Sequence, residues 1–262
     1  MSGLLEIEGL TLGYGARVVL RGVTLSAAPG EVVALIGPNG SGKSTLIRGA
    51  SGLLGPTAGR VTLDGQPLHD LAPRLRARRV AVVPQAARCP DAFTVEDTVL
   101  LGRTAYLGWV GRESDADRRV AREAMERTAV ASLAYRRLGE ISGGELQLAL
   151  IARALAQEAP VLLLDEPTAH LDLRHETRIL AMVRDLAHRD RRAVLMALHD
   201  LNLAARFADR IALLGGGRLQ ALGSPREVLT EEKLSAAYGI PVHVAEHPSL
   251  KIPWILAGEE SP

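Results

Sequence analysis

Short apolar runs recur along the chain and are separated by more polar stretches. Four mainly aliphatic runs of four to six residues lie at 31–36, 79–83, 161–164 and 193–198. Continuous aliphatic runs of this length predict strands that are buried on both faces. Because stretches with helical signals lie between the runs, the pattern predicts an α/β fold.

Antiparallel pairs are predicted near both ends of the chain. Residues 5–8 alternate apolar and polar positions, and residues 18–25 form a second strand-like run after a glycine-bounded turn at 13–15. Residues 59–63 are typical of a strand that ends in a tight turn. Residues 211–222 are typical of a closing hairpin around three glycines.

Helical signals dominate residues 86–159. Ser114 is predicted to cap a helix that runs to about residue 130, with Glu123 and Arg127 paired on its solvent face. A second helix is predicted over 142–155. Further helices are predicted over 175–188 and 231–238.

Composition excludes some classes of function. Of 262 residues, 47% are hydrophobic and 23% charged, and 31 basic residues balance 30 acidic ones, which gives no sign of a nucleic-acid partner. The single cysteine, the lack of a signal-peptide pattern and the lack of a run of about 18 apolar residues favour the cytoplasm. Any membrane role is expected to come through a partner.

A phosphate-binding pattern follows the first aliphatic run. Residues 37–45, GPNGSGKST, match G-x-x-x-x-G-K-S, whose glycines let backbone N–H groups approach a triphosphate closely. Lys43 supplies a positive charge, the Ser44 hydroxyl can ligate Mg²⁺, and a helix is predicted to start at the phosphates. The predicted phosphate loop consists of Gly37, Pro38, Asn39, Gly40, Ser41, Gly42, Lys43, Ser44 and Thr45.

Two carboxylates end the run at 161–164. Asp165 and Glu166 lie where ligands gather in α/β sheets, and a Mg²⁺ site beside a phosphate loop needs such oxygen donors. Tyr14 could stack on a purine or simply pack in its turn, and its residue type alone leaves both open. Three further candidates lie at strand ends or a helix start: Gln85, His199 and Ser142-Gly143-Gly144, the last predicting a second anion site.

In this order the motifs resemble the nucleotide-binding subunit of ATP-binding-cassette (ABC) transporters over essentially the whole chain. The resemblance implies a P-loop NTPase, with a RecA-like core, an N-terminal antiparallel β-subdomain and an inserted α-helical subdomain. It also implies core segments 1–85 and 160–239, a helical subdomain at 86–159 and a C-terminal tail at 240–262, all within one ABC domain.

The resemblance assigns roles to the candidates. It implies that the catalytic residues are Glu166, His199, Lys43 and Gln85. The residues that bind Mg²⁺ would be Ser44, Gln85 and Asp165. The residues that bind ATP would be Tyr14, the phosphate loop 37–45, Ser142, Gly143, Gly144 and Asp172. The residues around Ser142 would act on the ATP of a second copy.

The sequence departs from the family in three places. Ile141 stands where Leu is usual, Leu148 where Arg is frequent, and Ala169-His170 where Ser-Ala is commoner. Replacing Leu by Ile conserves volume and should cost little. In the segment 169–172, only Asp172 is assigned the role that the family gives to its position.

Three segments, 100–109, 237–242 and 247–248, resemble importers of ferric siderophores, haem and cobalamin. This implies a homodimer of ATPase subunits, two membrane-spanning permease subunits and a substrate-binding protein, at the cytoplasmic face of the inner membrane. Residues 86–109, including Arg103 and Tyr106, are expected to meet the permease.

Three alternatives remain open. An exporter ATPase is the first, and a soluble ABC protein of DNA repair or translation is the second. The chain shows one copy of each motif and no heptad run, which argues against the second. A kinase or GTPase would leave Ser142-Gly143-Gly144 without a role.

Overall fold

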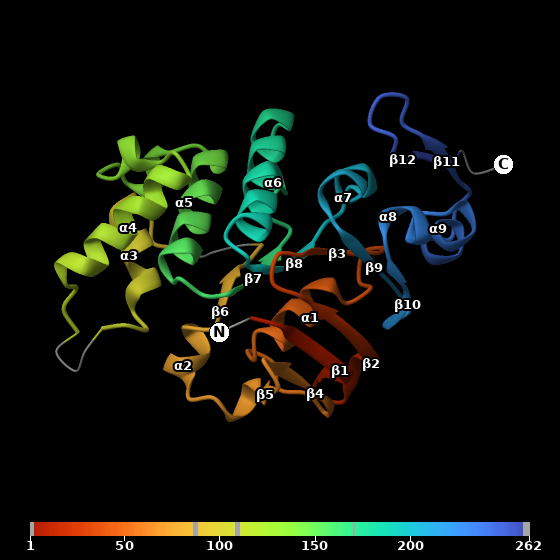
Figure 1. Ribbon diagram of the computed structural model, residues 1–262, viewed down its shortest axis with the longest axis horizontal. Helices are drawn as coiled ribbons and strands as arrows, with labels where there is room; N and C mark the ends of the chain where they lie inside the picture. Colours follow the sequence, from red (N-terminus) through yellow and green to blue (C-terminus); the bar gives the residue numbers. More distant parts are fainter. Residues whose placement is uncertain (1–2, 86–88, 108–110, 170, 259–262) are drawn as a thin grey trace.

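A mixed six-stranded sheet forms the centre of the molecule (Figure 1). The computed structural model describes residues 3–85, 89–107, 111–169 and 171–258. The strand order is β10-β9-β3-β8-β7-β6, and every neighbouring pair is parallel except β9 with β10. The strands are β3 (Val32–Ile36), β6 (Val80–Val83), β7 (Val161–Asp165), β8 (Ala193–Ala197), β9 (Arg210–Gly215) and β10 (Arg218–Gly223).

Both faces of this sheet are buried, which explains the continuous aliphatic runs. Successive side chains of a strand point to opposite faces. Val33 and Leu35 therefore pack with α1 (Lys43–Ala50) and the N-terminal sheet, whereas Ala34 and Ile36 join a core built with the helices of the other face.

An antiparallel sheet packs against α1, in the order β2-β1-β4-β5. Its strands are β1 (Leu5–Tyr14), β2 (Arg17–Ala27), β4 (Ala58–Leu63) and β5 (Gln66–Pro67). Leu5 pairs with Ala27 on one side and with Leu63 on the other. The predicted hairpin is present, and β1 extends to Tyr14, which pairs with Arg17 and therefore lies beside the turn between β1 and β2.

A group of helices lies to one side of the central sheet (Figure 1). It is made of α3 (Val95–Leu100), α4 (Asp115–Arg127) and α5 (Gly143–Ala156), with the short 3-10 turns η2 (Leu101–Arg103), η3 (Ala131–Leu133) and η4 (Leu138–Glu140). Ser114 caps α4 as predicted. The expected pairing of Arg127 with Glu123 is wrong, because Arg127 donates to Asp190 in the loop before β8.

The remaining elements cover the sheet and its edges. They are η1 (Leu68–Asp70), α2 (Pro73–Ala77), α6 (Leu173–His188), α7 (Leu201–Phe207), α8 (Pro225–Val228), α9 (Glu231–Tyr238), β11 (Val242–Glu246) and β12 (Pro253–Ala257). No helix within the described ranges is long and apolar enough to cross a membrane.

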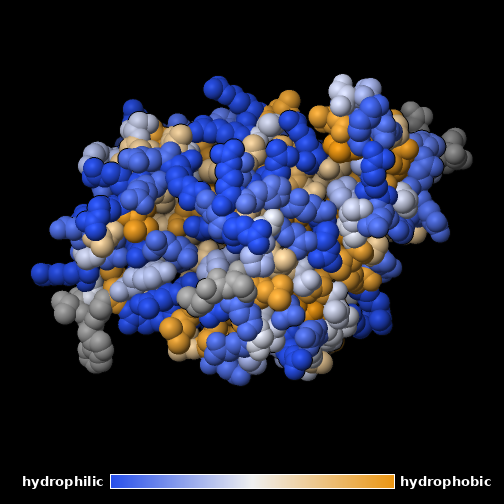
Figure 2. Space-filling view, in the orientation of Figure 1, coloured by the Kyte–Doolittle hydropathy of each residue, from blue (hydrophilic) through white to orange (hydrophobic). Residues whose placement is uncertain are grey.

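The segment expected to be a tail folds as a hairpin of β11 and β12. The side-chain amide of Asn202 in α7 accepts from the backbone N–H of Ile255 at 2.8 Å and donates to its carbonyl at 3.2 Å. Hydrophobic side chains gather on the surface over this hairpin (Figure 2), where Leu250, Trp254 and Leu256 are exposed.

Arg103 joins the helical region to the core and is only 6% exposed. Its guanidinium donates to Asp117 at 2.9 Å and to Glu158 at 2.6 Å, and lies 3.9 Å from the centre of the Tyr106 ring. Arg78 lies over the same ring at 4.6 Å. Arg103 therefore holds the interior together, and the expectation that it meets a membrane partner is wrong. Ala86, Ala87, Arg88, Gly108 and Trp109 of the same expected surface lie outside the described residues.

Candidate functional site

The phosphate loop connects β3 to α1 and depends on its glycines. Gly37, Gly40 and Gly42 have φ values of 143°, 78° and 105°, a region that L side chains rarely adopt. A Cβ on Gly37 would lie 2.1 Å from the carbonyl oxygen of Leu214, and one on Gly42 would lie 2.5 Å from a methyl of Leu20. The loop can therefore pass this close to β9 and β2 only with glycine at positions 37 and 42.

Lys43 lies at the centre of the loop. Its Nζ donates to the carbonyl oxygens of Gly37 at 2.8 Å and Pro38 at 3.3 Å. Burial lowers the pKa of Lys43, and the carboxylates of Glu166 and Asp165 oppose that shift. The Ser41 hydroxyl is buried without a hydrogen-bond partner among the described residues. The loop thus offers a cation and a free hydroxyl to an anion.

Ser44 and Asp165 meet at the start of α1. The Ser44 hydroxyl donates to Oδ1 of Asp165 at 2.9 Å, although the two lie 121 positions apart. Burial raises the pKa of Asp165, Glu166 adds to the shift, and the Ser44 hydrogen bond opposes it. A hydroxyl and a carboxylate are hard oxygen donors, so this pair fits Mg²⁺, which takes few protein ligands beside substrate phosphates. The described residues contain no cluster of three or more His, Cys, Asp or Glu side chains suited to a metal.

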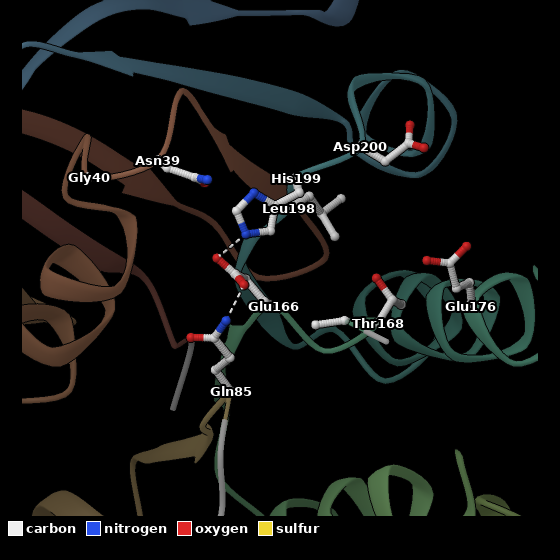
Figure 3. Close-up of a pocket in the computed structure, with 10 residues that line it drawn as sticks. Asn39, Gly40, Gln85, Glu166, Thr168, Glu176, Leu198, His199 and Asp200 are labelled. Atoms are coloured by element: carbon white, nitrogen blue, oxygen red, sulfur yellow. Dashed lines mark hydrogen bonds and ion pairs between the residues drawn. The ribbon is translucent and has the colours of Figure 1, made fainter. Parts of the chain in front are cut away.

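Glu166 lies between His199 and Gln85 (Figure 3). Its Oε1 is 2.5 Å from Nε2 of His199, and its Oε2 accepts from the Gln85 amide. These three residues follow β7, β8 and β6, which are neighbours in the sheet, so topology gathers them at one edge. Glu166 is 8% exposed and has a φ of 52°, whereas the side chain of His199 is 48% exposed.

Two adjoining pockets open at this edge. One of about 370 Å³ is lined by Tyr14, the phosphate loop, Glu166 and His199. A second of about 600 Å³ shares Glu166 and His199 and extends to Gln85. Tyr14 is 45% exposed, and its hydroxyl accepts from Arg48 of α1 at 3.0 Å. A flat ring held beside a phosphate loop can stack on a base.

Sequence reasoning missed several lining residues of these pockets. Arg17 and Val19 line the smaller pocket, and Thr168, Glu176 and Asp200 line the larger one. Arg17 and Val19 could have been found from their place just after Tyr14 in the hairpin. Glu176 carries no motif, and its place depends on how α6 packs.

The predicted second anion site lies apart from these pockets. Ser142 caps α5, its hydroxyl donates to Oε2 of Glu145 at 2.8 Å, and its backbone N–H donates to the same oxygen at 2.8 Å. Of the described residues, those that line the two pockets do not include Ser142, Gly143, Gly144 or Asp172. A single chain therefore brings together only part of the predicted site.

Comparison with known proteins decides the family. Residues 20–169 match the ABC transporter family, which is more than half of the chain. The chain belongs to the ABC transporter family. This confirms the resemblance seen in the motifs and, with the architecture above, the predicted P-loop NTPase fold with its β- and helical subdomains. The expected boundaries between the subdomains stay a prediction.

Individual ABC proteins are similar over nearly the whole chain. The Hemin import ATP-binding protein HmuV of Gloeobacter violaceus is 46% identical over 260 residues, covering 97% of this chain and 94% of that protein. The Cobalamin import ATP-binding protein BtuD of Halobacterium salinarum is 45% identical over 245 residues. This alignment covers 94% of the chain but spans only 61% of that relative's length.

A solved ABC structure gives the same fold. It is a metal-chelate type ABC transporter in an inward-facing conformation, with a TM-score of 0.87 and 29% identity. The match covers 99% of this chain and 98% of that one, so it includes the C-terminal hairpin.

Proposed function

We propose that this chain is an ATP hydrolase that drives an ABC importer of a metal chelate such as haem, cobalamin or a ferric siderophore. One observation carries the hydrolase: a carboxylate, Glu166, lies beside the phosphate loop with a histidine and a glutamine on its two oxygens. The cargo class rests on the relatives, which are named as hemin and cobalamin import proteins.

ATP would occupy the two adjoining pockets. Tyr14 would stack on the base, backbone N–H groups of 37–45 would surround the phosphates, and Nζ of Lys43 would exchange its two carbonyl partners for phosphate oxygens. Ser44, Asp165 and Gln85 would hold Mg²⁺, which supplies charge neutralisation at the phosphates when bound. Of these three, Ser44 and Asp165 already lie together, joined by a hydrogen bond of 2.9 Å.

Hydrolysis transfers the γ-phosphoryl group to water. Glu166 would orient this water and take its proton, and His199 and Lys43 would stabilise charge on the transferred group. Both oxygens of Glu166 are engaged by His199 and Gln85 in this structure. Each oxygen keeps a second lone pair, so the carboxylate can accept from a water while His199 and Gln85 hold its orientation.

The site needs a second copy of the chain. Ser142, Gly143, Gly144 and Asp172 do not line the nucleotide pockets of their own chain. A triphosphate between two chains would meet the phosphate loop of one chain and the start of α5 of the other, and both present N–H groups at a helix start. We therefore propose a head-to-tail homodimer that encloses two ATP molecules.

The dimer would act on two permease subunits, with a substrate-binding protein on the far side and no nucleic acid involved. This places the chain at the cytoplasmic face of the cell membrane. ATP binding closes the dimer and hydrolysis opens it, and the permease follows this movement.

Purification from membranes tests the proposal. The tagged chain should retain a polytopic permease. Proteoliposomes that contain both, with ATP and the chain inside and the substrate-binding protein outside, should take up haem, cobalamin or a ferric siderophore. The Glu166→Gln chain should retain the same permease without uptake. A permease that instead moves substrate away from the ATPase side indicates an exporter, and a chain that retains no permease indicates a soluble ABC protein.

A further inference from the structure

His175, in the first turn of α6, lies between two segments that the motifs treat as separate. Its backbone N–H donates to Oδ1 of Asp172 at 2.8 Å, and its ring Nδ1 lies 2.9 Å from the same oxygen. Because a carboxylate only accepts hydrogen bonds, the proton of this contact is on Nδ1. Two bonds to one oxygen fix the orientation of the imidazole ring.

The other side of the ring covers Gly144 in the first turn of α5. A Cβ on Gly144 would lie 2.7 Å from Cδ2, 2.9 Å from Cγ and 3.1 Å from Nε2 of His175. Gly143 is different, since a Cβ there would meet nothing within 4 Å. The second glycine of the motif therefore leaves the room that the His175 ring occupies.

The His175 side chain also acts on the cap of α5. The backbone N–H and hydroxyl of Ser142 lower the pKa of Glu145, and His175 contributes in the same direction. The ring thus lies between Asp172, at the start of its own helix, and Gly144 of α5. Its side chain is 29% exposed, so it is accessible at this surface.

We infer that His175 is a positioning residue that ties the start of α5 to the start of α6, so that Ser142 and Asp172 face the partner's ATP as one rigid surface. The inference rests on the proposed homodimer. Without the ring, no side chain of α6 would cover Gly144, and the first turns of α5 and α6 could shift independently. ATP binding to the chain's own phosphate loop would not be affected.

Two substitutions separate the two contacts of the ring. His175→Leu keeps bulk over Gly144 but removes the Nδ1 bond to Asp172, and His175→Asn keeps a donor near Nδ1 but removes most of the ring. His188→Leu is the matched control, because His188 forms a comparable pair with Asp209 at 2.9 Å, between α6 and the start of β9.

ATP-dependent dimerisation in a Glu166→Gln background is the first measurement. Each His175 variant should bind ATP as a single chain within about twofold of its parent. The ATP concentration for half-maximal dimerisation should rise about tenfold, which corresponds to about 1.4 kcal/mol in the free energy of dimerisation. The His188→Leu chain should dimerise like the parent. Unchanged dimerisation of both His175 variants would overturn the inference.

The second measurement shows in which chain His175 acts. A Ser142→Arg chain keeps its own Lys43, and a Lys43→Ala chain keeps its own Ser142, so a mixture contains one complete composite site per heterodimer. Placing His175→Leu in the Lys43→Ala chain should lower turnover of the mixture about tenfold. Placing it in the Ser142→Arg chain should change turnover by less than about twofold.

The outcomes separate the two proposals. If the mixture without any His175 change shows no turnover, the composite site itself is wrong, and the role of His175 fails with it. If the mixture turns over but His175→Leu has the same effect in either chain, the homodimer stands and the inference is overturned, because a general structural role would act from both sides.

Discussion

The Nε2 atom of His199 lies 2.5 Å from Oε1 of Glu166, and the Gln85 amide occupies the other oxygen of the same carboxylate (Figure 3). The two contacts join the ends of three neighbouring strands across the floor of the pocket. In this arrangement Glu166 is held in one orientation, and each of its oxygens keeps a second lone pair that can accept from water. A γ-phosphate that arrives beside His199 would compete with Glu166 for the imidazole.

Replacing Glu166 by glutamine should stop turnover and leave ATP binding intact. The amide keeps the size and can still contact Gln85 and His199, but it cannot take a proton from water. Turnover should fall at least about a thousandfold, and the ATP-bound dimer should accumulate. Size-exclusion chromatography with ATP checks this, with nucleotide-free protein as the reference. A Glu166→Gln chain that stays monomeric in saturating ATP would contradict the dimer.

Replacing Lys43 by alanine should abolish hydrolysis and weaken ATP binding at least about tenfold. The loop would lose the cation that reaches the carbonyl oxygens of Gly37 and Pro38 and that faces the phosphates. Isothermal titration with ATP gives the affinity. Lys233→Ala is the control, because Lys233 contacts the carbonyl of Glu227 at the chain's surface. Near-normal turnover of the Lys43→Ala chain would rule out the phosphate-loop assignment.

Local pattern was enough to predict the central sheet and the residues at its ends. The run at 161–164 is buried on both faces, so its aliphatic pattern predicts β7. Glu166 was singled out because it lies at the end of this strand. Gln85 and His199 were found for the same reason, since each follows a buried run. That both contact Glu166 depends on strand order, and the sequence pattern alone does not contain that order.

Other features depend on contacts between distant segments. Arg103 looks like a surface arginine in sequence, but Asp117 and Glu158 arrive from two other segments and allow it to be buried. The hairpin of β11 and β12 depends on Asn202 in the same way. His175 was one of several histidines without a motif, because its relation to Gly144 exists only once α6 packs beside α5.

Replacing Arg103 by leucine should destabilise the fold by roughly 3 kcal/mol. The substitution leaves the buried carboxylate of Asp117 without its guanidinium, and breaking a buried pair from one side is costly. Urea unfolding gives the free energy of unfolding. Arg60→Leu is the control, because its pair with Glu8 is exposed and should contribute less than about 1 kcal/mol. Equal effects of the two substitutions would contradict the structural role of Arg103.

Acid should unfold the chain partly through Asp117. The hydroxyl and then the backbone N–H of Ser114 lower the pKa of Asp117 from 3.8 to about 2, with a further contribution from Arg103. A carboxyl whose pKa is lower in the folded state binds fewer protons there than in the unfolded state. Its stabilisation is therefore complete above about pH 4 and is lost as the pH falls from about 4 to about 2.

Asp117→Asn removes this dependence, because its amide does not titrate. The asparagine chain should be less stable than the parent at pH 6, since it loses the charge-assisted contact with Arg103 and one acceptor of the Ser114 cap. The difference should narrow as the pH approaches 3. Urea midpoints at pH 6, 4 and 3 for both chains measure it, and Asp115→Asn, in the same first turn, is the control. A difference that stays constant over this range would show that the Asp117 charge does not stabilise the fold.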